Sequence, residues 1–271
     1  MSWARIMAPL SGAASDGEAL VAAKALAAPF EAELAAVFAP ADAAELMPWM
    51  GEGFMGGVQV AALDSLKQAT AEAERRARAH FDGLGYSHGR FLALGSPVAS
   101  ELAMEARLSD VVVFGRDAVR GRGPLVEAFQ QVLMEERRPV LIARSLPSLD
   151  DTIAVAWDGG REATRSARIA SPWLAKAKRV VILAAPQATP RDFDPVRMKE
   201  LFAQRGVKAE VETLGQSGEP GPMLLAASRG VGAHLLVAGA FGHPRFQQFI
   251  FGGTTKHLMQ ADDGPSLFLT H

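Results

Sequence analysis

The residues of this sequence that could most readily do chemistry lie between Gly239 and Thr255. Gly239 and Gly242 are followed, after nine residues, by the run Gly252-Gly253-Thr254-Thr255. Glycine has no Cβ and lets a ligand approach the main chain, and the first amides of a helix have no partner within the helix. With threonine hydroxyls beside them, such amides can bind phosphate oxygens. The spacing is neither that of a Walker loop nor that of a Rossmann fingerprint. Turns and helix caps are the alternative interpretation of these glycines.

A second candidate, Asp158, follows the apolar run Ile153–Trp157. Ligands of open α/β sheets bind beyond the carboxyl ends of the strands, where the winding direction reverses. The strands before Asp158 and before Gly239 are expected to be neighbours at that point. A carboxylate there could bind a base edge or a ribose. It could also cap the following helix, since aspartate is a favoured N-cap residue, and the two roles are compatible.

The elements that would position these residues recur along the chain. RIMAPLSG (Arg5–Gly12) resembles TIAVAWDGG (Thr152–Gly160), DVVVFGR resembles HLLVAGA, and RPVLIAR resembles GPSLFLTH. The first half carries about 23 more residues between its first two segments than the second half does. Most of the excess falls in the Met- and Gly-rich stretch Glu45–Gly57, which is expected to be a loop. It either covers a ligand or packs over a domain interface or a partner subunit.

Apolar strands alternating with helical segments predict a parallel sheet covered on both faces. We therefore expect an α/β protein of two doubly wound, Rossmann-like domains, residues 1–146 and 152–271, each with a five-stranded, mainly parallel sheet. The apolar last strands, PVLIA and SLFLT, should pair and pack the halves as a pseudo-dimer. In the second half the expected strands are 153–157, 180–185, 208–214, 234–238 and 266–270. The expected helices there are 163–175, 195–205, 222–228 and 254–259.

These motifs together resemble the universal stress protein family. The second half is similar throughout, in AVAWDGGREATRSARIA and GAFGHPRFQQFIFGGTTKHL, and the whole chain resembles a tandem of two such domains. The resemblance implies a nucleotide site, typically for ATP, with Mg²⁺ as a further candidate ligand. It implies adenine near Trp157 and Asp158, ribose and phosphates on Gly239, Phe241 and Gly242, and the phosphate tail on Gly252, Gly253, Thr254 and Thr255.

Two departures from the family pattern bear on function. The residue after the third motif glycine is usually Ser or Thr in nucleotide-binding members, and here it is Gly253. The first half has Ser11 where the second has Asp158, and Gly115 is followed by no second motif glycine. The first domain is therefore expected to be degenerate and to act as a structural or regulatory partner.

The composition of the chain excludes several classes of partner and of catalytic chemistry. The net charge of −2 without a basic block argues against nucleic acid as a partner. The absence of cysteine excludes disulfides and thiolate catalysis. No apolar run is long enough to span a membrane and the start does not read as a signal peptide, so a cytoplasmic location is expected. GYSHG (Gly85–Gly89) matches GxSxG, but a helical segment precedes it and a strand follows, so a plain turn is expected.

The sequence thus predicts a stress-associated protein that binds an adenine nucleotide in its second domain only and is regulatory rather than catalytic. The alternatives are an interaction or scaffold protein with a vestigial site, and an enzyme that hydrolyses ATP slowly. A homodimer of the whole chain is also compatible with the fold.

Overall fold

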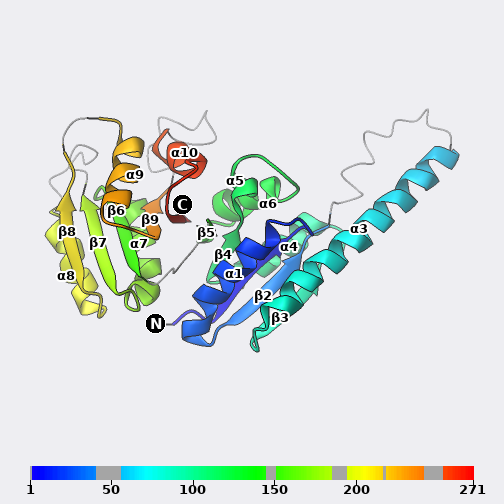
Figure 1. Ribbon diagram of the computed structural model, residues 1–271, viewed down its shortest axis with the longest axis horizontal. Helices are drawn as coiled ribbons and strands as arrows, with labels where there is room; N and C mark the ends of the chain where they lie inside the picture. The colour runs from blue at the N-terminus through cyan, green and yellow to red at the C-terminus, as the bar shows by residue number, and fades with distance from the viewer. Residues whose placement is uncertain (1, 41–55, 145–150, 185–193, 216–217, 241–252) are drawn as a thin grey trace. The chain divides into compact units, whose positions relative to one another are not determined.

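The computed structural model describes residues 2–40, 56–144, 151–184, 194–215, 218–240 and 253–271 (Figure 1). The chain forms two compact units. The N-terminal unit is Ala4–Val132, and the C-terminal unit combines Met1–Trp3 with Leu133–His271. The predicted domain boundary falls at residues 147–151, of which 147–150 lie outside the described residues, and the division into 1–146 and 152–271 stays a prediction.

The N-terminal unit is built on parallel strands in the order β3-β2-β1-β4. These strands are β1 (Arg5–Leu10), β2 (Glu33–Phe38), β3 (Gly89–Ala93) and β4 (Val111–Phe114). The helices are α1 (Asp16–Ala27), η1 (Ala28–Phe30), α3 (Gly56–Leu84), α4 (Val98–Arg107), α5 (Arg116–Val119) and α6 (Val126–Gln130). The short helical segment η3 (Gln131–Glu135) begins in this unit and ends in the C-terminal unit. After the charged first residues of β1 and β2, the central strands are apolar and buried, as expected of strands that helices cover on both faces.

The extra residues of the first half include a long helix as well as the predicted loop. α3 has 29 residues, against 10 for its counterpart in the second half, α8 (Pro195–Gln204). At 1.5 Å per residue α3 is about 43 Å long, and Figure 1 shows it extending past the ends of the strands beside it. Of the predicted loop Glu45–Gly57, residues 45–55 lie outside the described residues, and Gly56 and Gly57 begin α3. GYSHG forms the expected turn between α3 and β3.

The C-terminal unit has the strand order β5-β10-β9-β6-β7-β8. These strands are β5 (Val140–Ile142), β6 (Thr152–Trp157), β7 (Arg179–Ala184), β8 (Ala209–Thr213), β9 (Leu235–Gly239) and β10 (Ser266–Thr270). The helices are α7 (Arg161–Leu174), α8, α9 (Pro220–Gly230) and α10 (Gly253–Gln260). The α/β class and every strand and helix predicted for this half are confirmed.

The predicted pairing of the two last strands is also confirmed. β5 runs antiparallel to β10, with Leu141 opposite Phe268, whereas the other described pairs of this unit are parallel. This pairing explains why Leu133–Ala143 belongs to the C-terminal unit although the repeat pattern assigns it to the first half. The packing of the two halves as a pseudo-dimer stays a prediction.

Aromatic side chains fill the core of the C-terminal unit. Trp3 stacks on Trp173, with ring centroids 6.1 Å apart, and on Phe268, with centroids 6.0 Å apart. All three side chains are buried. Trp3 therefore fixes the N-terminal segment to the C-terminal unit by burial of its apolar side chain.

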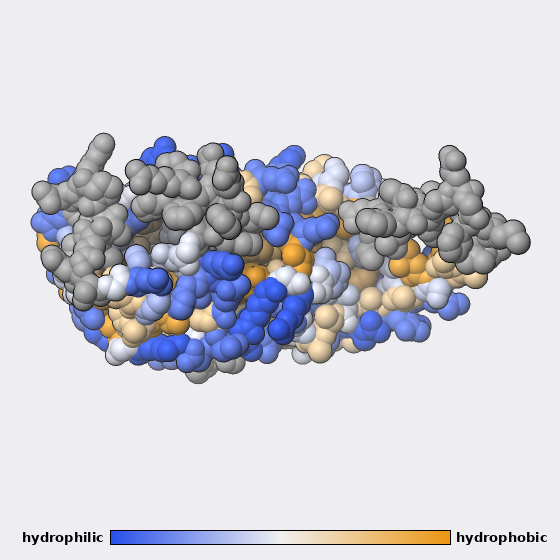
Figure 2. Space-filling model, turned by 90° about the horizontal axis from the view of Figure 1, so that it is seen from above, coloured by the Kyte–Doolittle hydropathy of each residue, from blue (hydrophilic) through white to orange (hydrophobic). Residues whose placement is uncertain are grey.

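The surface has the opposite character. On the face drawn in Figure 2, hydrophilic residues cover most of the coloured surface, with smaller hydrophobic areas between them.

Candidate functional site

Strands β6 and β9 bring Trp157 and Gly239 to the same edge of the sheet. The two strands are parallel neighbours, with Val155 opposite Val237, and each continues for two more residues. The neighbour relation expected from the sequence is therefore confirmed, and it lies where open α/β sheets bind ligands. The Trp157 residue is only 4% exposed. A ligand at this edge would therefore meet main-chain atoms of Trp157 and not the face of its indole.

Asp158 lies in the turn between β6 and α7 and is half-buried. Its Oδ1 accepts a hydrogen bond from the amide of Gly160 at 2.8 Å, while its Oδ2 accepts none from the described residues. Gly159 has φ +73°, a left-handed conformation that favours glycine. Gly160 is the N-cap of α7, so Asp158 closes the turn before the helix and does not occupy the N-cap itself. One carboxylate oxygen thus remains available to a ligand.

The packing of the protein requires glycine at position 239, for a reason that the sequence did not indicate. A Cβ on this residue would lie 2.6 Å from the Ala163 amide nitrogen and 2.6 Å from the Glu162 carbonyl carbon. Such contacts are far shorter than van der Waals distances. The glycine lets the first turn of α7 pack directly against the end of β9. This close packing differs from the predicted role, in which the missing Cβ made room for a ligand.

The run after the third motif glycine opens a helix, as predicted. α10 begins at Gly253, so its first amides have no partner within the helix. A Cβ on Gly253 would have no neighbour within 4 Å in the part of the chain that the structure describes. Thr254 is half-buried, whereas Thr255 is 6% exposed and faces the protein interior. Of the two threonine hydroxyls, that of Thr254 is the more accessible. The remaining predicted site residues, Phe241, Gly242 and Gly252, lie outside the described residues.

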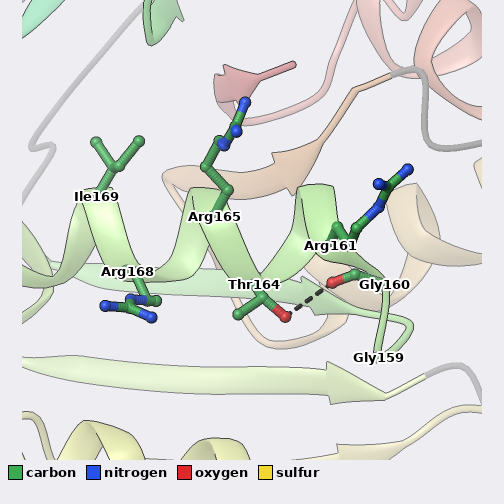
Figure 3. A pocket seen from close by; sticks show the side chains of 7 residues that line it. All are labelled: Gly159, Gly160, Arg161, Thr164, Arg165, Arg168 and Ile169. Atoms are coloured by element: carbon green, nitrogen blue, oxygen red, sulfur yellow. Dashed lines mark hydrogen bonds between the residues drawn. The ribbon is translucent and has the colours of Figure 1, made fainter.

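A hollow of about 420 Å³ begins at the Asp158 turn and follows α7 (Figure 3). Its lining consists of Gly159, Gly160, Arg161, Thr164, Arg165, Arg168 and Ile169. In Figure 3 Arg161 and Arg165 extend to the same side of the helix and Arg168 to another. Arg165 donates to the backbone oxygen of His271 at 2.5 Å, and Arg161 Nη2 lies 3.9 Å from a carboxylate oxygen of Glu162. The three arginines line the hollow with positively charged groups, which favour anions.

Sequence reasoning missed these arginines. The signal that could have found them is their helical spacing in DGGREATRSAR, where arginines recur at positions 161, 165 and 168.

The corresponding turn of the N-terminal unit is filled by the chain itself. Gly12 has φ +79°, so it repeats the backbone conformation of Gly159. The amides of Ser11 and Gly12 donate to Oδ2 of Asp16 at 3.0 and 2.7 Å. Asp16 is 3% exposed, and burial raises its pKa although these hydrogen bonds act in the opposite direction. The amides that could have faced a ligand are therefore already satisfied.

Helix α3 covers the same turn. A Cβ on Gly12 would lie 2.4 Å from the carbonyl oxygen of Ala73, and Arg76 Nε donates to the Gly12 oxygen at 2.9 Å. The long helix thus packs onto the carboxyl end of β1. In the N-terminal unit this end of the sheet is closed by Asp16, Ala73 and Arg76.

Two further observations concern function. Within the described ranges, no three His, Cys, Asp or Glu side chains are grouped as a metal ion would require. No helix in the described part of the chain is long and apolar enough to cross a membrane.

Comparison with known proteins identifies the second half most directly. Residues 172–265 match the model of the universal stress protein family. The comparison with curated proteins found no match.

Solved structures extend the similarity to the whole chain. A universal stress protein from Archaeoglobus fulgidus DSM 4304 covers 98% of this chain and 95% of its own, with a TM-score of 0.67 and 16% identity. A protein described as a putative universal stress protein, from Pseudomonas aeruginosa UCBPP-PA14, covers 99% and 93%, with a TM-score of 0.54 and 16% identity. At such identities the similarity shows the shared fold. The family match therefore assigns residues 172–265 to the universal stress protein family, and the solved structures show the same fold over both halves of the chain.

Proposed function

We propose that the C-terminal unit binds an adenine nucleotide, ATP in the first place, and that the N-terminal unit does not. The site comprises Asp158 and the main chain at Trp157 and Gly239, with the N-terminal turn of α10 for the phosphates. Phe241, Gly242 and Gly252, predicted to contribute, complete the proposed site.

The observation that carries the proposal is the contrast between the two repeats at a backbone turn that both of them contain. In the N-terminal unit the amides after β1 are bonded to Asp16, and Ala73 packs onto Gly12. In the C-terminal unit Asp158 keeps one oxygen that accepts from no donor among the described residues, and none of those residues comes within 4 Å of the Cβ position of Gly253. Two copies of one fold therefore differ at the point where doubly wound sheets bind ligands.

The chemistry of the site fits a nucleotide. The Asp158 Oδ2 can accept from an exocyclic amine of the base or from a ribose hydroxyl. The amides at the start of α10 and the Thr254 hydroxyl can donate to phosphate oxygens. The arginines of α7 attract the negative charge during association. These groups bind and orient, which supports a regulatory role.

The test is a calorimetric titration of the full chain with ATP, ADP and AMP, with and without Mg²⁺. We expect binding of ATP and about a tenfold loss of affinity in Asp158→Ala, since a hydrogen bond to a charged group contributes about 1.5 kcal/mol or more. Asp64→Ala removes an exposed carboxylate of the other unit and should leave affinity unchanged. At about 100 times Kd, ATP should also raise the free energy of unfolding by about 2.7 kcal/mol.

Absence of binding and of any thermal shift with all three nucleotides would overturn the proposal and favour a scaffold with a vestigial site. Release of phosphate from bound ATP, abolished by Asp158→Ala, would instead favour the slow hydrolase.

A further inference from the structure

Arg144 is a buried arginine in the C-terminal unit, two residues after the end of strand β5. The residue is only 3% exposed. Arginine is almost never fully buried unless its donors are bonded, because removing its charge from water is costly. Its position therefore requires a specific set of partners.

Those partners are backbone oxygens around the end of α10. Nη2 of Arg144 donates to the carbonyl oxygens of Leu258 at 2.5 Å and Met259 at 3.3 Å. Nη1 donates to the carbonyl oxygen of Pro265 at 2.9 Å, and the Arg144 amide donates to Ser266 Oγ at 3.1 Å. Leu258 and Met259 lie in the last turn of α10, where carbonyl groups have no partner within the helix. The guanidinium caps this end, where the helix dipole also favours a cation.

The surroundings leave space for the guanidinium and little else. A Cβ on Gly264 would lie 2.3 Å from Arg144 Nη1 and 2.8 Å from Leu225 Cδ1. Gly264 has no positive φ, so its backbone conformation does not call for glycine. The absence of a side chain at position 264 therefore follows from the room that Arg144 occupies.

Arg144 holds one end of a helix whose other end belongs to the proposed site. α10 has eight residues, so its two ends are about 12 Å apart and move together as one rigid element. Thr255, Leu258 and Met259 are buried on one face of the helix, and His257 packs against Gly221 of α9. These contacts fix the helix sideways. The hydrogen bonds from Arg144 are directed at its carbonyl end and oppose displacement along its axis.

We infer that Arg144 is a positioning residue for the nucleotide site: it fixes α10 from its C-terminal end so that the turn Gly253–Thr255 faces the phosphates. This inference rests on the proposed function. In the sequence Arg144 closes the first repeat, RPVLIAR. The repeat that has a closed site thus supplies a residue that the other repeat needs for binding.

The experiment compares Arg144→Met and Arg144→Lys with the unchanged full chain, at a temperature where all variants are folded. ATP affinity is measured by calorimetry, and hydrogen exchange is measured for the amides of α10. Arg144→Met should lower affinity at least tenfold and speed exchange along α10. Arg144→Lys keeps the charge but has a single ammonium group in place of the planar fork, so it should recover part of both losses. It also serves as the readout if Arg144→Met does not fold.

The matched control is Phe202→Leu, which removes buried volume on α8 of the same unit. It should lower the free energy of unfolding while affinity stays within about twofold of the unchanged chain, because α8 packs against β7 and β8, whereas its contact with β6, the strand that precedes Asp158, is at most weak. Unchanged ATP affinity in Arg144→Met would overturn the inference and leave the proposed function standing. An equal loss of affinity in Phe202→Leu would also overturn it, by showing that general destabilisation is sufficient. Failure of the unchanged chain to bind any nucleotide would overturn the proposed function and the inference with it.

Discussion

A substitution at position 253 can measure how much a single hydroxyl group contributes to nucleotide binding at the proposed site. The family pattern has Ser or Thr there, whereas this chain has glycine, and no described residue lies within 4 Å of its Cβ position. The backbone of Gly253 has no positive φ, so a side chain can be added without strain. A serine would place a further donor at the start of α10, next to the expected phosphates.

We expect Gly253→Ser to raise ATP affinity about threefold to tenfold, the equivalent of one hydrogen bond of about 0.6 to 1.4 kcal/mol. Gly253→Ala adds the Cβ without the hydroxyl and should leave affinity within about twofold. Calorimetric titration measures both. Equal affinity of the serine and alanine variants would show that the phosphates do not reach this turn.

Asp16 gives the N-terminal unit a pH-dependent stability. Burial raises the pKa of its carboxyl group, so between the ordinary value of about 3.9 and the raised value the folded chain holds a proton that the unfolded chain has lost. In that window the free energy of unfolding decreases as pH rises, because the unfolded state binds fewer protons than the folded state. Stability from this group is therefore greatest below the window.

Urea unfolding from about pH 4 to about pH 7, followed for the N-terminal unit by hydrogen exchange, measures this decrease. Asp16→Asn keeps an oxygen acceptor for the Ser11 and Gly12 amides and does not titrate, so it should flatten the decrease. Ser11→Ala removes a hydroxyl contact that lowers the pKa of Asp16, and it should widen the window. A slope that both variants leave unchanged would assign the pH dependence to other groups.

At the scale of elements, a substitution at Gly239 can distinguish two roles of this glycine: close packing of α7 against β9, or space for a ligand. An alanine at this position would put its Cβ 2.6 Å from the backbone of α7. The helix would have to move away from the end of β9, and overpacking of this kind costs about 1 to 3 kcal/mol. We expect Gly239→Ala to lower the stability of the protein without ligand by that amount, measured by urea unfolding.

The control is Gly230→Ala, at the end of α9, where a Cβ meets no atom within 4 Å. It should be neutral or slightly stabilising, since alanine favours helix. If Gly239→Ala left stability unchanged and reduced only ATP affinity, the ligand role predicted from the sequence would be the correct one.

The elements themselves could be predicted well from the sequence. Strands such as Val111–Phe114 and Arg179–Ala184 are covered on both faces, so their apolar runs stand out from the amphipathic helices between them. The helix start at Gly253 and the turn at GYSHG also followed from local chemistry. The role of Gly239 could not be predicted, because it depends on which helix approaches that strand. The closure of Gly12 by Ala73 is likewise a contact between residues 61 positions apart.

At the scale of the whole molecule, the N-terminal segment belongs to the C-terminal unit. Trp3 is buried between Trp173 and Phe268, although it precedes the first strand of the other unit by two residues. Trp3→Ala should lower the free energy of unfolding of the C-terminal unit by about 3 kcal/mol or more, because it removes a large buried side chain and leaves a cavity.

Urea unfolding gives the size of this loss, and hydrogen exchange at β10 shows its location. Trp3→Phe retains an aromatic ring and should recover part of the stability. Faster exchange confined to β1 and β2 would contradict the assignment of Trp3 to the C-terminal unit. The sequence could not predict this assignment, since no repeat or motif includes Trp3.

The pairing of β5 with β10 has a consequence for biosynthesis. Leu141 is translated 127 residues before its partner Phe268. At a translation rate of about 5 to 20 residues per second, the edge of β5 that pairs with β10 stays unpaired for about 6 to 25 s. Throughout that interval a growing polypeptide presents an apolar strand edge, a form that other nascent chains or a holdase chaperone can engage. Pauses in translation downstream of β5 would therefore raise the yield of aggregated product.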